Sequence, residues 1–267
     1  MTVLALASLL IGVLCYGFAG VELHSGSNVA ANPMRSRAWW RGTALQAGGF
    51  LAMLLSRISL PLLLVQACAS AGLAVTALIQ HLRGVHRLGP SDLAAVLTVV
   101  AGLGLIGATV ESSAAAEITT TLIGLIAGGL AVSAAGLLVR LPGVASGALS
   151  GLGFGMAAVA ARLVLGDYEH PVWLFWRLPA ANWITGVLVA AGVVCGQFHL
   201  SRGLRGRAAA PVLGTNYLVA TVLPAVIGFA AMGETPRPGT FVATGCGLVA
   251  AMLGIGWLLL RGGLDDQ

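Results

Sequence analysis

The sequence predicts an all-α, polytopic membrane protein of about nine transmembrane helices, each formed by about 20 apolar residues. Three observations lead to this prediction. Of the 267 residues, 58% are hydrophobic, only 9% are charged, and the hydrophobic residues gather into long runs that short polar segments separate. A soluble domain has roughly a quarter of its residues charged, so this chain cannot cover a water-facing surface.

The apolar runs follow one another along the chain with short polar breaks between them. In order they are Val3–Gly20, Gly42–Ile58, Leu60–Leu82, Leu93–Val110, Ile118–Val139, Gly143–Leu165, Trp183–Leu200, Pro211–Met232 and Thr240–Leu260. No basic segment precedes the first run, so we interpret it as a retained helix rather than a signal peptide. Most prolines stand at helix starts or in loops, where a missing N–H costs least. Pro224 lies within the eighth run and predicts a kink there.

The 14 basic residues are all arginines, and the loops of the two sides share them very unequally. One side holds Arg35, Arg37, Arg41, Arg83, Arg87, Arg140, Arg202, Arg205, Arg207 and Arg261. The other side holds Arg57, Arg177 and Arg237, and Arg162 lies near the end of the sixth run. Because basic loops stay in the cytoplasm, this bias predicts an outer N-terminus and a cytoplasmic C-terminus in the cell inner (plasma) membrane. Nucleic-acid binding is not expected, since it needs a soluble basic module.

Two parts of the chain share a pattern. In the first, Trp40–Gly42 opens the second run and Gln66 lies in the third; in the second, Trp183–Gly186 opens the seventh run and Asn216 lies in the eighth. The predicted units are a first helical repeat over 1–110, a connecting helix within 111–142 and a second helical repeat over 143–267. The two copies lie an odd number of spans apart, so they cross the membrane in opposite senses. Inverted repeats of this kind are typical of transporters.

Three short motifs stand in order along the chain: Trp39–Gly42 before a glycine-rich helix, Leu62–Gln66 in the next run, and Met232–Glu234 at the close of the eighth. Together with the helix rhythm from about Trp39 to Leu260, they resemble the drug/metabolite transporter (DMT) superfamily, in particular its EamA-like and NIPA-like branches. The resemblance implies an EamA-like bundle of two inverted repeats that carries a small solute by alternating access.

The chain departs from that pattern at three points. Many members of the superfamily have ten helices, and a proline often follows the Val-Gln pair, where this chain has Ala67. The acid expected at the end of the third run is replaced near Gln80 to Gly84. Mg²⁺, which the NIPA-like branch carries, prefers hard oxygen ligands that usually include carboxylates. We therefore expect a neutral or anionic solute, such as a metabolite or a lipid-linked headgroup, with Mg²⁺ transport of the NIPA type as the alternative.

Polar residues inside the apolar runs are the candidates for a binding site, because such groups are costly in lipid and mark function by default. Gln66 and Asn216 occupy corresponding places in the two repeats and form the main candidate pair. The full candidate set is Gln66, Asn216, Tyr217, Gln46, Tyr16 and Arg162. Hydrogen bonding between helices is the alternative role for the amides. Snorkelling to the interface is the alternative for Arg162.

The nine acids all fall in loops, at helix ends or in the tail. Three of these acids lie close enough to a run to bring a carboxylate into the membrane if they folded inward: Glu111, Glu117 and Glu234. We expect instead that water at the membrane interface solvates them. The four cysteines lie inside apolar runs without metal spacing. No metal site and no cofactor are expected.

Glycines form two stripes at helical spacing. Gly143, Gly147, Gly151 and Gly155 recur every four residues, and Gly124 and Gly128 form a shorter stripe. Close packing within the chain is expected for both, and a homodimer through these faces is the alternative.

The sequence thus predicts a transporter of a small-molecule solute, embedded in the lipid bilayer, rather than an enzyme. It has neither a dinucleotide or phosphate loop after a soluble strand nor the metal-protease pattern HExxH. Two rivals stay open. One is a non-transporting membrane scaffold subunit whose glycine stripes dock a partner. The other is a membrane enzyme acting on lipid, which would need converging acids, histidines or metal ligands at one depth.

Overall fold

The computed structural model describes residues 2–29, 35–60, 62–82, 89–110, 117–167, 169–205 and 209–264. Within these residues the chain is α-helical and contains no strand, apart from an isolated bridge between Val110 and Pro236. The predicted all-α class is therefore confirmed. Several residues named above, among them Glu111, Arg83, Arg87 and Arg207, lie outside the described residues.

The described helices follow the predicted runs closely. Their bounds are α1 Thr2–Val29, α2 Arg37–Arg57, α3 Leu62–Ser70, α4 Gly72–Leu82, α5 Pro90–Thr109, α6 Thr120–Gly136, α7 Gly143–Gly166, the short 3₁₀ helix η2 Val172–Arg177, α8 Ala180–Gly203, α9 Ala209–Ala231 and α10 Phe241–Leu264. Helix starts carry the local signals that stabilise them. The side chains of Ser36 and Thr119 accept hydrogen bonds from first-turn N–H groups of α2 and α6 that have no partner within the helix, and Asp92 caps α5 through the N–H of Gly89.

The third predicted run is two helices rather than one, because the helix breaks between Ser70 and Gly72. At this break the N–H of Ala71 is shared between the carbonyls of Ala67, at 3.3 Å, and Cys68, at 3.0 Å. Thr76 on α4 donates to the carbonyl of Gly17 on α1, so α4 is held against α1. The hydrophobic pattern of the sequence predicts one continuous helix for a run of this length. The contact between α4 and α1 could not be predicted, because Gly17 and Thr76 lie far apart in the sequence.

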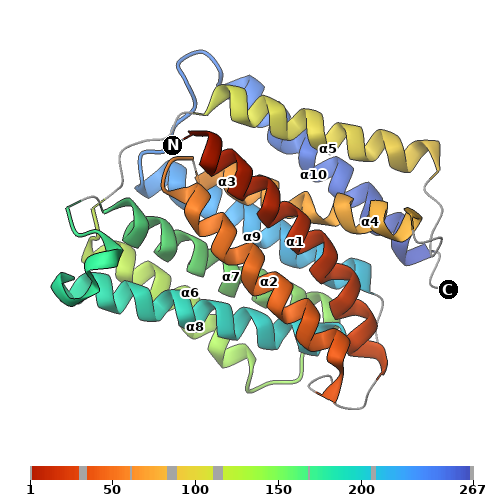
Figure 1. Cartoon of the computed structure of the whole chain (residues 1–267), viewed down its shortest axis with the longest axis horizontal. Coiled ribbons are helices and arrows are strands. Elements are labelled where there is room, and N and C mark those ends of the chain that lie inside the picture. Colours follow the sequence, from red (N-terminus) through yellow and green to blue (C-terminus); the bar gives the residue numbers. More distant parts are fainter. Residues whose placement is uncertain are drawn as a thin grey trace.

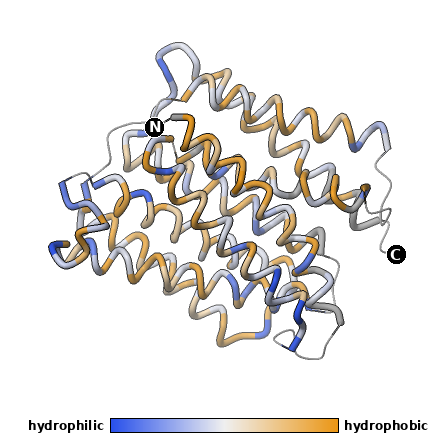
Figure 2. The backbone as a smooth tube through the Cα atoms, in the orientation of Figure 1, coloured by the Kyte–Doolittle hydropathy of each residue, from blue (hydrophilic) through white to orange (hydrophobic). Residues whose placement is uncertain are grey.

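Within the described residues, five helices are long and apolar enough to cross a membrane. They contain Val3–Leu23, Pro90–Thr109, Gly143–Gly166, Ala180–Gly203 and Val212–Ala231. Three shorter apolar helical segments accompany them: Leu64–Ile79, Thr120–Gly136 and Phe241–Trp257. Hydrophobic residues run along the helices and hydrophilic residues gather at their ends and in the loops (Figure 2). The chain is therefore a helical, multi-pass membrane protein.

The helices pack in two groups that meet in the middle of the bundle. α1 lies along α2 and α4, and α7 lies along α8 and α9. α3 of the first group contacts α9 of the second, and α6 covers α7 and α8. α5 and α10 pair with each other along one side of the molecule, with α6 and α8 on the opposite side (Figure 1).

The longer glycine stripe packs within the chain. A Cβ on Gly151 of α7 would lie 2.5 Å from the carbonyl oxygen of Asn216 on α9, and a Cβ on Gly147 would meet the carbonyl of Val212. These glycines let the backbones of α7 and α9 approach closely. The shorter stripe differs, because nothing lies within 4 Å of a Cβ built on Gly124 or Gly128. The expected close packing within the chain is therefore right for the first stripe and wrong for the second.

Candidate functional site

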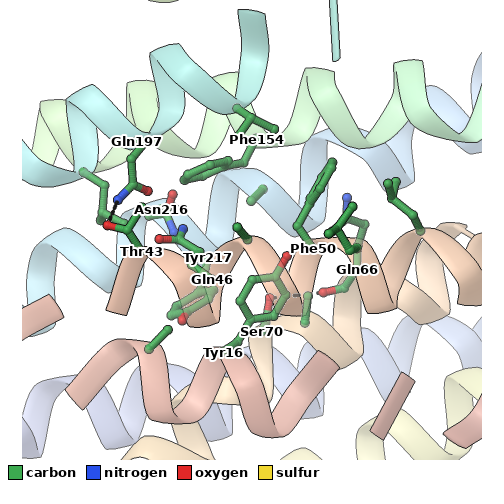
Figure 3. A pocket seen from close by; sticks show the side chains of 18 of the residues that line it. Tyr16, Thr43, Gln46, Phe50, Gln66, Ser70, Phe154, Gln197, Asn216 and Tyr217 are labelled. Atoms are coloured by element: carbon green, nitrogen blue, oxygen red, sulfur yellow. Dashed lines mark hydrogen bonds between the residues drawn. The ribbon is translucent and has the colours of Figure 1, made fainter. Parts of the chain in front are cut away.

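A cavity of about 560 Å³ lies where the two groups of helices meet. Its walls come from α1, α2, α3, α7, α8 and α9, and Figure 3 shows its labelled side chains. The polar and aromatic lining residues are Tyr16, Thr43, Gln46, Phe50, Arg57, Gln66, Ser70, Phe154, Gln197, Asn216, Tyr217 and Thr221. Most of the other lining residues are aliphatic. A mostly apolar pocket with a few polar groups is typical of small-molecule sites.

The cavity brings together five of the six residues that the sequence singled out. Gln66 comes from α3, Asn216 and Tyr217 from α9, Gln46 from α2 and Tyr16 from α1. Four helices therefore contribute these side chains to one space, and Figure 3 shows them around it. Whether they bind a solute stays a prediction.

The inner wall of this cavity is polar and buried. Gln66 and Asn216 are each only 5% exposed, and Ser70 and Thr221 are buried behind them. The hydroxyls of Ser70 on α3 and Thr221 on α9 form a hydrogen bond that ties the two groups of helices together. We call Gln66, Ser70, Asn216 and Thr221 the polar floor.

The opposite rim is apolar and exposed. It consists of Ala47 and Leu51 on α2 and of Ala190 and Val194 on α8, each pair one helical turn apart. Leu51 is 62% exposed and Val194 53% exposed. Because these residues both line the cavity and face outward, the cavity opens sideways between α2 and α8. We call these four residues the apolar lips.

The lips are joined at one end. Gln197 Nε2 on α8 donates to Thr43 Oγ1 on α2 at 3.3 Å, as the dashed line in Figure 3 shows. Apart from this hydrogen bond, the described residues of α2 and α8 lie close to each other at few points. The opening therefore extends away from the Thr43–Gln197 contact toward Arg57, the last residue of α2.

Several polar atoms at the cavity have no hydrogen-bond partner in the described part of the chain. They are Nε and Nη1 of Arg57, Oε1 of Gln46 and Oδ1 of Asn216. Buried polar atoms are nearly always hydrogen-bonded, so such atoms need an explanation. A bound solute would supply both donors for the amide oxygens and acceptors for the guanidinium.

Arg162, the sixth predicted residue, does not line the cavity. Its side chain is 2% exposed, and its Nε donates to Oε1 of Glu234 at 3.0 Å. Its Nη1 donates to the carbonyl oxygen of Arg57 at 2.6 Å. Snorkelling to the interface is wrong for Arg162, because its side chain is buried against the carboxylate of Glu234. Its predicted role in binding a solute stays a prediction. The ion pair connects α7 to the end of α2.

Glu234 also differs from the prediction, since it is buried rather than solvated at the interface. Its second oxygen, Oε2, accepts the N–H of Leu62 at the start of α3, at 2.9 Å. Gly233 has φ +68°, which turns the chain back after α9 and directs Glu234 inward. Glu117 is exposed as expected. Arg57, Leu62, Arg162 and Glu234 thus form one buried polar cluster, which we call the end cluster.

Sequence reasoning missed Arg57, which it interpreted as a loop residue. In the structure Arg57 ends α2 and is 2% exposed. Its spacing carried a signal, because Thr43, Gln46, Phe50 and Arg57 recur at intervals of three, four and seven residues. That spacing places them on one face of a helix. All four line the cavity.

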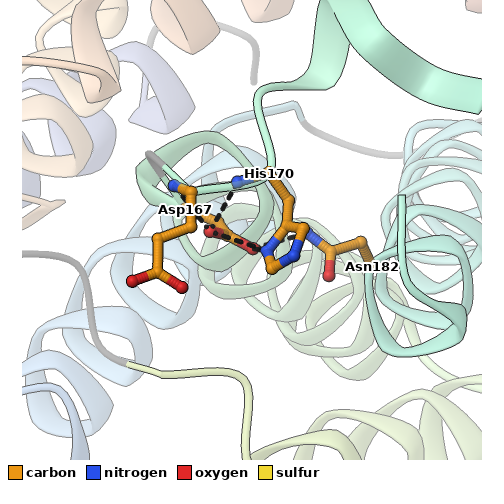
Figure 4. Close-up of polar contacts among 4 residues, drawn as sticks. Asp167, His170 and Asn182 are labelled. Carbon is orange, nitrogen blue, oxygen red and sulfur yellow. Dashed lines mark hydrogen bonds and ion pairs between the residues drawn. The ribbon is translucent and has the colours of Figure 1, made fainter. Parts of the chain in front are cut away.

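A second polar group holds the turn between α7 and α8, outside the cavity (Figure 4). Asp167 Oδ2 accepts from Asn182 Nδ2 at 2.9 Å and lies 3.1 Å from Nδ1 of His170, while Oδ1 accepts from the N–H groups of Glu169 and His170. Burial acts to raise the pKa of Asp167, but the hydrogen bonds from Asn182 and His170 outweigh it and lower the pKa below its ordinary value of 3.8. The group caps and orders this turn.

Comparison with known proteins assigns no family: no family model, no curated protein and no solved structure matches this chain. The site is therefore interpreted from its own residues.

Proposed function

We propose that this protein is a secondary membrane transporter that carries a small polar metabolite or an anionic, lipid-linked solute by alternating access. The observation that carries the proposal is the cavity between the two helix groups, with unpaired polar atoms from Arg57, Gln46 and Asn216. Each such atom costs free energy without a partner, and at the cavity several of them from different helices line one space large enough for a small molecule.

The packing pattern supports a pair of inverted repeats of the DMT type. α1 packs on α2 and α4 in the first group as α7 packs on α8 and α9 in the second. The last helix of each proposed repeat, α5 and α10, pairs with the other. Under this proposal 1–110 and 143–267 are the repeats and the chain crosses the inner membrane about nine times, with its N-terminus outside.

Under this proposal the end cluster is a gate. Glu234 and Arg162, from the second group, hold the turn between α2 and α3 of the first group through Arg57 and Leu62. These contacts cross between the groups at one end of the cavity. In an alternating-access cycle they break when that end opens and reform when it closes, while the Thr43–Gln197 contact does the opposite.

Two alternatives are weighed against this proposal. Mg²⁺ transport is disfavoured because none of the described residues that line the cavity is an aspartate or glutamate. A scaffold subunit is disfavoured because its interior would be closed and filled. We also propose that the protein is a transporter rather than an enzyme.

The test is counterflow in proteoliposomes with the purified full chain. Neutral, anionic and cationic polar solutes are compared, and Mg²⁺ entry is followed with a trapped fluorescent indicator. We expect saturable exchange of a neutral or anionic solute that falls at least about tenfold when Gln66 and Asn216 are both replaced by leucine, because two polar contacts are lost. Thr98→Val, on the exposed face of α5, is the matched control and keeps wild-type exchange.

Two results would change the conclusion. Exchange selective for Mg²⁺ would replace the proposed solute class by the cation alternative. A folded protein that exchanges no solute of any class would overturn transport and favour the scaffold.

A further inference from the structure

Arg57 is a buried cation whose side chain has no carboxylate partner in the described part of the chain. Its side chain is 2% exposed, and its Nε and Nη1 have no hydrogen-bond partner among the described residues. The nearby carboxylate of Glu234 is already used, because one oxygen accepts from Arg162 and the other from the N–H of Leu62. The guanidinium carbon lies 5.3 Å from the ring centre of Phe50, which packs the side chain at the cavity wall.

An unpaired buried guanidinium is unfavourable unless an anion reaches it. The planar fork of arginine matches a carboxylate or phosphate through two parallel hydrogen bonds. Arg57 has two free donor nitrogens and lines the cavity, so its geometry suits an acidic group that enters from the cavity side.

The rest of the cavity indicates that the ligand also has an apolar part. The polar floor lies on α3 and α9, and the apolar lips open outward between α2 and α8. From Thr43 to Arg57 the α2 wall of the cavity spans roughly 21 Å at 1.5 Å per residue, so the cavity is long. In a membrane protein these exposed lips meet lipid chains rather than water.

We propose that the cavity binds an anionic amphiphile, with its phosphate or carboxylate group on Arg57 and its hydrocarbon chain passing out between the apolar lips into the bilayer. This inference deepens the proposed transport function and rests on it for the identity of the solute site. The polar floor receives the remaining polar atoms of the headgroup. A purely water-soluble anion would satisfy Arg57 but would leave the exposed lips without a role.

Binding to the purified full chain in detergent tests the proposal. The probes are phosphatidylglycerol, phosphatidylcholine with the same acyl chains, and glycerol 3-phosphate as the headgroup without chains. We expect phosphatidylglycerol to bind at least about tenfold more tightly than either of the others. Arg57→Gln weakens phosphatidylglycerol binding by roughly tenfold to a hundredfold, which is the loss of a charged hydrogen bond. Arg177→Gln, an exposed arginine of η2, is the matched control and changes nothing.

A second pair of variants tests the lips without touching Arg57. Ala190→Trp fills the opening and reduces phosphatidylglycerol binding several-fold, while glycerol 3-phosphate binding stays the same. Val187→Trp places the same ring on an exposed position of α8 that does not line the cavity, and it leaves both unchanged. This pair also decides the matter if Arg57→Gln fails to fold.

Three results would overturn the inference: equal binding of phosphatidylglycerol and phosphatidylcholine, binding of phosphatidylglycerol that Arg57→Gln does not alter, or glycerol 3-phosphate bound as tightly as the lipid. The last result would identify a soluble anion as the ligand. Because binding is measured without flux, its outcome is separate from that of transport. Selective binding of phosphatidylglycerol without any solute exchange would support the inference and contradict the proposed transport function. Solute exchange that does not depend on Arg57 or on the apolar lips would support transport and contradict the inference.

Discussion

Two arginines meet at the end of the cavity, and their surroundings differ completely. Arg57 and Arg162 are both 2% exposed, and Arg162 donates to the backbone carbonyl of Arg57. Arg162 pairs with a buried carboxylate at 3.0 Å, whereas two nitrogens of Arg57 have no partner in the described residues. Burial by itself therefore does not mark a functional charge. The difference lies in whether the protein supplies the partner. Arg162 is therefore interpreted as a residue that holds the end of the cavity closed, and Arg57 as one that is open to a ligand.

The largest expected effect on stability comes from replacing Arg162, the arginine that has a carboxylate partner. Arg162→Met leaves Glu234 buried without its cation, and the free energy of unfolding should fall by about 3–5 kcal/mol. Denaturant titration in detergent, followed by circular dichroism, measures this. The double variant Arg162→Met with Glu234→Leu should recover most of the loss, because neither charge is then left alone. Equal stability of the single variant and the wild type would contradict the interpretation of the end cluster.

Two glycines allow a similar comparison for helix packing. Gly151 is enclosed by a neighbouring helix, whereas the space around Gly124 is open. Gly151→Leu drives a side chain into the carbonyl of Asn216 and should lower the free energy of unfolding by about 1–3 kcal/mol or more. Gly124→Leu has open space around it and should leave stability unchanged or slightly higher. The same titration compares the two variants. Similar losses in both would mean that the two stripes are equally packed, as in a homodimer through α6.

Replacing Arg57 should have the opposite effect on stability from replacing Arg162. Arg57→Met removes a buried charge that has no carboxylate partner among the described residues, so the free energy of unfolding should stay within about 1 kcal/mol of wild type or rise. Solute exchange should nevertheless be lost. Measuring unfolding and counterflow on one preparation separates the two effects. A loss of stability as large as that of Arg162→Met would show that Arg57 is structural as well.

The smallest effect is expected at the turn between α7 and α8. Asp167→Asn should lower the free energy of unfolding by about 1 kcal/mol at neutral pH, since hydrogen bonds to the carboxylate weaken. The pKa of Asp167 is lowered in the folded protein, so its contribution is present above the ordinary value of 3.8 and is lost as the pH falls through the lowered pKa. Thermal unfolding of both proteins from pH 7 to pH 3 should show their difference shrinking only at the acidic end. A difference that shrinks already near pH 6 would contradict this assignment to the carboxylate of Asp167.

The sequence predicted the polar members of the cavity well and the charged ones badly. Gln66, Asn216, Tyr217, Gln46 and Tyr16 could be placed at the cavity because polar side chains are costly in lipid and turn toward the interior of a helical bundle. Charged residues near a helix end are ambiguous, because the interface and the interior lie within one side-chain length of each other. Arg57, Arg162 and Glu234 all stand at such positions.

Composition alone determined the class of this protein. With 58% hydrophobic and 9% charged residues, a chain of this length cannot be soluble, and its periodic apolar runs fix helices rather than strands. Composition and hydrophobic periodicity depend only on which residues are present and on their order, so they can be read without knowing which distant residues are in contact.

Only the tertiary structure decided which buried groups are satisfied. Residues 57, 162 and 234 are far apart in the chain, and their pairing depends on the close approach of α2, α7 and the turn after α9. The break between α3 and α4 and the lateral opening between α2 and α8 likewise arise from contacts between remote segments. A hydrogen bond is a distance of about 3 Å, and no local pattern in a sequence encodes a distance between remote residues.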